Sequence, residues 1–224
     1  FDEKLKISKY VNNIGIWYWK DFDYSKAIDY YEQSLAIKEE LGDTRNYGKT
    51  LNNLGEVYYD MGDFTSAIDH FNQSIAIKDT LGDQLGLNST LFNLGEAQIY
   101  NSNYDDALPN FRRALSIANT LEDKHQISER NKGIGIVHYN LAAYDSASHY
   151  LSKSDSIYIY LGIPINRLTT LSWLAITAMK AGSKSQAQNY FQSFNELIDQ
   201  HDPSPKDIIS INWNMYQAHV LAGD

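Results

Sequence analysis

The sequence contains no cysteine, only four prolines and no long hydrophobic run. The absence of cysteine excludes disulfides, thiol catalysis and cysteine-based zinc sites, and it fits a reducing cytosol and an oxidising periplasm equally well. No segment approaches the roughly 18 to 20 apolar residues of a membrane span, and Phe1 opens directly into polar sequence without a signal segment. The compartment therefore stays open, and no membrane span is expected in this region.

Positive charge is also scarce. The 19 Lys and Arg residues stand against 28 Asp and Glu, which gives a net charge of -9. Binding to nucleic acid regardless of sequence needs a cationic surface, so we expect no nucleic acid to bind through this region. The acidic balance favours a protein or peptide partner that is basic or neutral. With 43% hydrophobic and 21% charged residues, the chain can bury enough apolar surface to fold.

What the sequence does contain is an internal repeat with a period of 40 residues. The segment from Gly15 to Asp43 aligns with the segment from Gly55 to Asp83, and about half of the aligned residues are identical. A match of this length indicates duplication of one supersecondary unit.

Three columns recur at this period. A glycine column runs through Gly15, Gly55, Gly95 and Gly135 and ends at Ala175; an alanine column follows it, and four residues after each alanine stands a bulky residue. The alanines are Ala27, Ala67, Ala107, Ala147 and Ala187, and the bulky residues are Tyr31, Phe71, Phe111, Leu151 and Phe191. Residues four apart share one face of a helix, so the columns predict two helices that approach closely and a large side chain that fills the space beside them.

The spacing of Leu54-Gly55, Tyr58, Gly62-Asp63-Phe64, Ala67 and Phe71 resembles the tetratricopeptide repeat signature. The resemblance covers essentially the whole chain and implies an all-α fold, a right-handed superhelical solenoid of antiparallel helix hairpins. Two features depart from the usual signature: the proline near the end of the second helix is missing, and the period is 40 residues instead of 34. We therefore expect longer helices of about 16 to 18 residues.

We expect a single solenoid over residues 1–224, with repeats near 4–43, 44–83, 84–123, 124–163 and 164–203. The expected helices begin and end near 4–20, 24–41, 45–61, 64–81, 84–101, 104–121, 124–141, 144–161, 164–181 and 184–200. The pairs Gly42-Asp43 and Gly82-Asp83 place a left-handed helix end beside a good N-cap. A segment near 206–222 resembles the first helix of a sixth repeat, and solenoids normally close with a polar capping element, so we expect the chain to be a fragment of a longer protein.

No constellation typical of catalysis is found. The six histidines show no HExxH spacing, no glycine loop suits a phosphate, and acidic pairs such as Asp105-Asp106 flank turns where carboxylates complement a helix N-terminus. We therefore expect no enzyme, no metal site and no cofactor.

Three asparagines recur two residues before the glycine column: Asn13, Asn53 and Asn93. Asparagine is unfavourable in a helix interior, so its recurrence at this position indicates a role other than helix formation. An amide can donate and accept at once, which suits an extended peptide backbone. This row is similar to the asparagine ladder of long-repeat tetratricopeptide proteins that bind peptides, including kinesin light chains and spindle-orientation scaffolds. The alternative is that these amides bridge neighbouring helices or persist from the duplication.

Other polar and aromatic residues lie on the same stripe of the first helices, which in this family build the concave wall. Aromatic rings with polar tips make good recognition surfaces, although several of these rings could simply cover hairpin junctions. The candidates for partner binding beside the three asparagines are Asn12, Asn52, Lys9, Lys49, Glu56, Glu96, Trp19, Tyr59, Tyr100 and Tyr139. The clamp that holds chaperone tails in some relatives needs asparagine after the glycine column, where this chain has Ile16, Glu56 and Glu96, so a chaperone carboxylate is not expected.

Three functional hypotheses follow. The first is a non-catalytic interaction module that binds an extended or helical segment in the concave groove. The second is a sensory or dimerising region of a larger bacterial signalling protein, because the 40-residue units resemble repeat regions that precede histidine kinase or LuxR-type output domains. Self-association through an uncapped end is a third reading.

Overall fold

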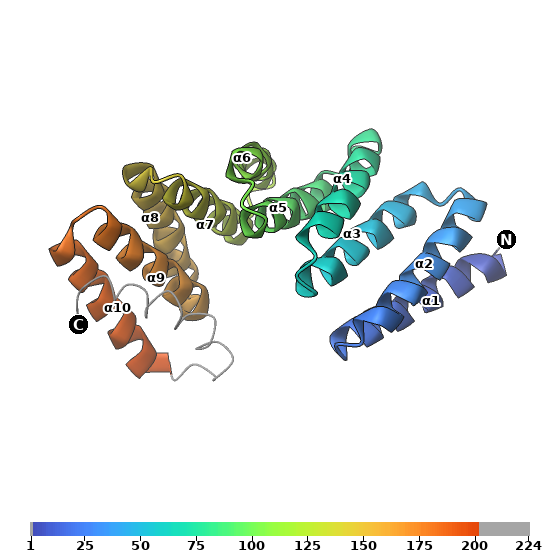
Figure 1. The fold of residues 1–224 in the computed structure, drawn as a ribbon, viewed down its shortest axis with the longest axis horizontal. Coiled ribbons are helices and arrows are strands. Elements are labelled where there is room, and N and C mark those ends of the chain that lie inside the picture. The colour runs from blue at the N-terminus through green and yellow to red at the C-terminus, as the bar shows by residue number, and fades with distance from the viewer. Residues whose placement is uncertain (1, 202–224) are drawn as a thin grey trace. The chain divides into compact units, whose positions relative to one another are not determined.

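The computed structural model describes residues 2–201, and in this range ten α-helices follow one another through short turns (Figure 1). They are α1 (Asp2–Lys20), α2 (Tyr24–Leu41), α3 (Thr44–Asp60), α4 (Phe64–Thr80), α5 (Gln84–Tyr100), α6 (Tyr104–Thr120), α7 (Lys124–Asn140), α8 (Tyr144–Leu161), α9 (Pro164–Lys180) and α10 (Lys184–His201). Each begins and ends within about two residues of its expected place, so the all-α fold class and the long helices are confirmed. The helix expected near 206–222 lies outside the described residues.

Helix ends follow the turn chemistry that the sequence contains. Gly42 adopts the left-handed conformation (φ 64°) at the end of α2, and the Asp43 side chain then accepts a hydrogen bond from the Asn46 backbone N–H at the start of α3. Gly82 and Asp83 repeat this arrangement between α4 and α5. A left-handed glycine ends one helix and an aspartate caps the next, which keeps the connections short.

The glycine column explains why the two helices of a hairpin approach closely. A Cβ atom placed on Gly55 would lie 2.5 Å from a ring carbon of Phe71, and one on Gly15 would lie 2.9 Å from the Tyr31 ring. In the first four hairpins, the bulky residue of the second helix therefore rests directly on the glycine of the first helix. Any larger residue at Gly55 would force the hairpin apart.

The chain divides into two compact units, Phe1–Ile117 and Ala118–Asp224. In the first, α1 pairs with α2 and α3 pairs with α4, while α3 also contacts α1 and α5. One of its core clusters joins two hairpins, since Ala27 and Tyr31 of α2 pack with Leu54 and Val57 of α3. The cores of successive hairpins are thus shared, as in solenoids generally.

In the second unit, α7 pairs with α8 and α9 pairs with α10, and α8 also contacts α9. One of its core clusters consists of Leu151, Leu168, Leu171, Leu174, Phe194 and Leu197. Among residues 2–201, no helix is both long and apolar enough to cross a membrane. The prediction of a single solenoid over residues 1–224 stays a prediction.

Candidate functional site

The polar residues predicted for binding gather on the first-helix face, which we define as the surface formed by α1, α3 and α5 of the first unit. The 40-residue period places equivalent side chains at the same height on successive helices. From α1 come Lys9, Asn12, Asn13 and Trp19, from α3 Lys49, Asn52, Asn53, Glu56 and Tyr59, and from α5 Asn93 and Glu96. Because α3 contacts both α1 and α5, these side chains meet and form two pockets.

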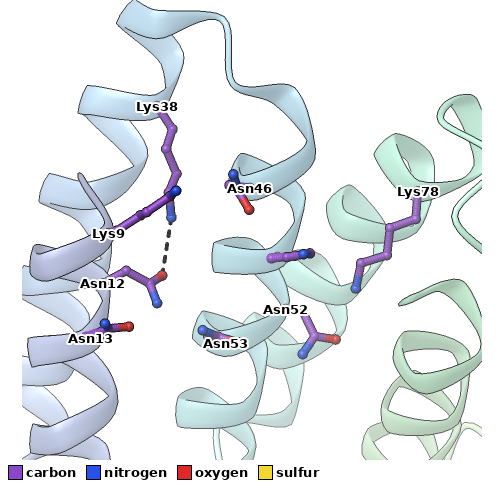
Figure 2. A pocket seen from close by; sticks show the side chains of 9 residues that line it. Lys9, Asn12, Asn13, Lys38, Asn46, Asn52, Asn53 and Lys78 are labelled. Carbon is purple, nitrogen blue, oxygen red and sulfur yellow. Dashed lines mark hydrogen bonds between the residues drawn. The ribbon is translucent and has the colours of Figure 1, made fainter. Parts of the chain in front are cut away.

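The first of these, the lysine pocket, has a volume of about 340 Å³. It is lined by Lys9, Asn12, Asn13, Lys38, Asn46, Lys49, Asn52, Asn53 and Lys78. Figure 2 shows Lys38 entering from α2 and Lys78 from α4, on either side of α3. Four lysines and five asparagines line this pocket and no carboxylate does, so it carries positive charge and many hydrogen-bond donors.

Two of these lysines are buried and held by a repeated set of partners. Lys38 is 3% exposed and donates hydrogen bonds to Thr50 and to the Asn12 side chain, at 3.3 Å from the latter. The Thr50 hydroxyl also donates to Asn12, at 2.8 Å.

One repeat later Lys78, 5% exposed, donates to Thr90, and the Thr90 hydroxyl donates to Asn52 at 2.7 Å. Each cluster ties two first helices to the second helix between them. Asn12 and Asn52 therefore bridge helices in addition to lining the pocket.

Burial changes the protonation of both lysines. Desolvation lowers the pKa of Lys38 to about 8 from its ordinary value of 10.5, with Asp43 opposing this effect and Lys49 adding to it. Burial likewise lowers the pKa of Lys78 to about 8, although Asp83 and Glu56 favour its charged form. The low-dielectric surroundings and the neighbouring ammonium of Lys49 thus disfavour positive charge at both positions.

The second pocket, here called the acidic pocket, measures about 190 Å³ and is lined by Trp19, Glu56, Tyr59, Asp60, Phe71, Asn93 and Glu96. The Trp19 indole N–H donates to the Asp60 carboxylate at 2.7 Å, which joins α1 to α3. Glu56 accepts hydrogen bonds from the Asn52 and Asn93 amides at 2.8 and 2.9 Å. Burial raises the pKa of Glu56, and these two amides oppose the rise by stabilising the carboxylate.

The three asparagines in register have three different environments. Asn13 is exposed and makes no hydrogen bond within the described residues. Asn53 is half-buried beside the Tyr31 hydroxyl, whose pKa is raised by burial and by Glu56 while Asn53 partly offsets the rise. Asn93 donates its amide to Glu56. The column thus contains one available amide and one that bridges α5 to α3.

All but two of the residues predicted for binding line these pockets. Tyr100 is 62% exposed at the end of α5, where its ring stacks on Phe64. Tyr139 lies in the second unit, where its ring packs edge-on against Trp173. Sequence reasoning missed Lys38, Asn46, Asp60, Phe71 and Lys78 as pocket residues. The recurrence of lysine at positions 38 and 78, threonine at 50 and 90, and asparagine at 12 and 52 was the signal for the lysine clusters.

Two family models match the chain, both described as tetratricopeptide repeat, over residues 7–80 and 90–124. The chain thus contains tetratricopeptide repeats in these two stretches. A comparison with curated protein sequences finds no match.

Solved structures share the fold of this chain at low sequence identity. RapI in its apo form matches with a TM-score of 0.78 and 20% identity over 88% of this chain and 55% of RapI. A Rap protein complexed with competence and sporulation factor matches with a TM-score of 0.71 and 18% identity, over 87% of this chain and 55% of that one. The chain spans little more than half the length of these Rap proteins.

A putative kinesin light chain from Podosopora anserina, with nearly identical repeats, gives a TM-score of 0.75 and 15% identity, over 88% of this chain and 96% of that one. At these identities the likenesses establish the fold. Tetratricopeptide repeats are a protein-interaction fold whose extended surfaces bind other proteins. Within residues 2–201, no group of three or more His, Asp or Glu side chains could hold a metal ion.

Proposed function

We propose that the first unit is a non-catalytic interaction module that binds an extended protein segment along the first-helix face. One observation carries the proposal: two neighbouring pockets on this face gather lysines, amides, carboxylates and aromatic rings from α1, α3 and α5. Amides at regular heights can pair with the N–H and C=O groups of an extended backbone. The likeness to a Rap protein in complex with competence and sporulation factor supports it, since that structure shows this fold with a bound factor.

The test needs a ligand, and a random peptide library displayed on phage supplies one. The whole chain is immobilised, peptides are selected, and the affinity of a selected peptide is measured by fluorescence anisotropy. Asn13→Ala should lower this affinity by about 1–3 kcal/mol through loss of a backbone hydrogen bond. Because Asn13 has no partner in the described residues and alanine has the higher helix propensity, its loss should not lower the free energy of unfolding.

The matched control is Asn189→Ala, which removes an exposed amide from α10. It should change neither affinity nor stability. Asn93→Ala is expected to lower stability as well as affinity, because Glu56 would lose a donor. Normal affinity in a folded Asn13→Ala and Asn53→Ala double variant would contradict the proposal.

A second candidate function is the sensory or dimerising region of a larger signalling protein, favoured by the likeness to the Rap proteins. It predicts that a longer version of the chain carries an output domain, and that the chain forms dimers in light scattering at micromolar concentration. A monomer at all concentrations would speak against the dimerising role. The absence of nucleic-acid binding through this region stays a prediction. It can be tested by adding DNA to the same samples and measuring the mass of any complex by light scattering.

A further inference from the structure

The lysine pocket concentrates like charges that nothing in its lining neutralises. Its four ammonium groups come from four helices, with Lys9 on α1, Lys38 on α2, Lys49 on α3 and Lys78 on α4. No carboxylate lines this pocket. Like charges held together in a partly buried space repel one another, and an anion that enters relieves the repulsion.

The carboxylates that favour the charged form of the buried lysines make their own hydrogen bonds to other groups. Asp43 accepts from the Asn46 backbone at 3.3 Å and from its side-chain amide at 2.7 Å, as the N-cap of α3. Asp83 caps α5 through the Gly86 backbone N–H at 3.1 Å.

Glu56, which also acts on Lys78, accepts from two asparagine amides. Buried lysines are ordinarily paired with a carboxylate, whereas Lys38 and Lys78 are held by neutral oxygens of threonine and asparagine. Their charge remains available to a ligand.

We propose that the lysine pocket binds the carboxylates of an acidic peptide segment, in contrast to the basic or neutral partner that the net charge of the whole chain favours. This inference rests on the proposed function and names the chemistry of the ligand at one end of the site. Asn13 adds an amide with no hydrogen-bond partner in the described residues, which can donate to a carboxylate oxygen and accept from a peptide N–H group.

The acidic pocket limits how far the negative charge of the ligand can extend. It presents Glu56, Asp60 and Glu96, which repel a second carboxylate. Along α3, Lys49 and Glu56 are separated by about 10 Å at the helical rise per residue. An extended peptide covers this distance in about three residues. The ligand should therefore carry Asp or Glu at one end and a neutral or basic residue about three positions away.

The same displayed random peptide library tests this pattern. Peptides selected by the whole chain should be enriched in Asp or Glu over the input library, with neutral or basic residues about three positions away on one side. Replacing the acidic residues of a selected peptide with Asn or Gln should weaken binding about tenfold or more, as expected for hydrogen bonds to charged groups. Selected peptides without acidic enrichment would overturn this inference while leaving the proposed function intact.

Variants of the protein test whether the lysines of this pocket bind the acidic peptide. Lys38→Met with Lys78→Met removes the buried charges and keeps the apolar stems, and Lys9→Met with Lys49→Met does so at exposed positions where folding is not at stake. Both pairs should lower affinity for an acidic peptide at least tenfold and leave that for its Asn or Gln counterpart unchanged. The matched control, Lys180→Met, removes an exposed lysine from α9 and should change nothing. Unchanged affinity in the folded Lys9 and Lys49 variant would overturn the inference.

A measurement without library selection separates a peptide site from a simple anion site. The wild-type chain is titrated with acetyl-Glu-Glu-amide, acetyl-Gln-Gln-amide and inorganic phosphate, and the lysine side-chain signals are followed by NMR. We expect shifts with the Glu peptide, which disappear in the Lys38 and Lys78 double variant, and no shifts with the Gln peptide. Binding of phosphate without binding of the Glu peptide would overturn the proposal, and so would the absence of any shift.

Discussion

Replacing Lys38 with methionine should change how the stability of the protein depends on pH. Lys38 is 3% exposed, and burial lowers its pKa to about 8 from 10.5. Between these two pH values the unfolded chain holds a proton that the folded chain has released. The free energy of unfolding of the wild type therefore rises as the pH increases from 8 to 10.5, and below pH 8 the full cost of the buried charge is present.

The magnitude follows from the difference between the two pKa values. At about 1.4 kcal/mol per pKa unit, keeping Lys38 protonated in the folded state costs about 3 kcal/mol at pH 7. Methionine keeps the buried stem and removes the charge, and Asn12 retains the Thr50 hydroxyl as a donor. The free energy of unfolding of Lys38→Met minus that of the wild type should therefore be about 3 kcal/mol larger at pH 7 than at pH 10.5. The lost hydrogen bonds lower this difference by the same amount at every pH, so they do not affect the comparison.

The assay is urea denaturation followed by circular dichroism at pH 7, 8, 9 and 10.5, in buffers without phosphate so that no oxyanion occupies the pocket. Only the difference between variant and wild type is used, which cancels the titration of the tyrosines. Lys180→Met is the control. Because this lysine is exposed, the difference in free energy of unfolding between this variant and the wild type should not change with pH. A difference between Lys38→Met and wild type that stays constant from pH 7 to 10.5 would refute the reasoning about this buried charge.

Two further predictions concern packing and a partly buried ion pair. Gly55→Ala should lower the free energy of unfolding by about 1–3 kcal/mol, because its Cβ would lie 2.5 Å from the Phe71 ring, and Phe71→Leu in the same chain should recover part of the loss in thermal denaturation. Arg167→Met should destabilise the second unit, because Arg167 donates at 3.0 Å to Asp155, whose pKa burial already raises. Since a raised carboxyl pKa destabilises only above the unfolded value, this loss should be larger at pH 7 than at pH 4, and Asp155→Asn should remove the pH dependence.

The fold could be predicted from the sequence because the residues that specify it act locally and recur in every repeat. The glycine and bulky columns, the left-handed glycines such as Gly42 and the capping aspartates such as Asp43 each act within one hairpin. These residues recur in successive repeats, so the helix bounds could be derived by comparing the repeats with one another. The same periodicity predicted which residues share the first-helix face.

The exposure and the hydrogen-bond partners of each residue on the first-helix face could not be predicted from the sequence. Asn13, Asn53 and Asn93 occupy one column, yet Asn13 is exposed whereas Asn93 donates to Glu56 of the preceding repeat. A side chain on a first helix meets partners from the neighbouring hairpins, and those partners vary while the packing columns stay constant. Sequence spacing predicts position within a repeat but not these contacts between repeats.

The lysine pocket illustrates this division most clearly. By itself the sequence determined that the chain folds into helix hairpins of a 40-residue period with a polar first-helix face, because that information lies within each unit. Only the tertiary structure decided that Lys38 and Lys78, which belong to second helices, extend between the first helices and make part of an acidic protein locally cationic. The physical reason is that a long side chain can cross from one helix layer to the next, where burial and neighbouring charges set its protonation.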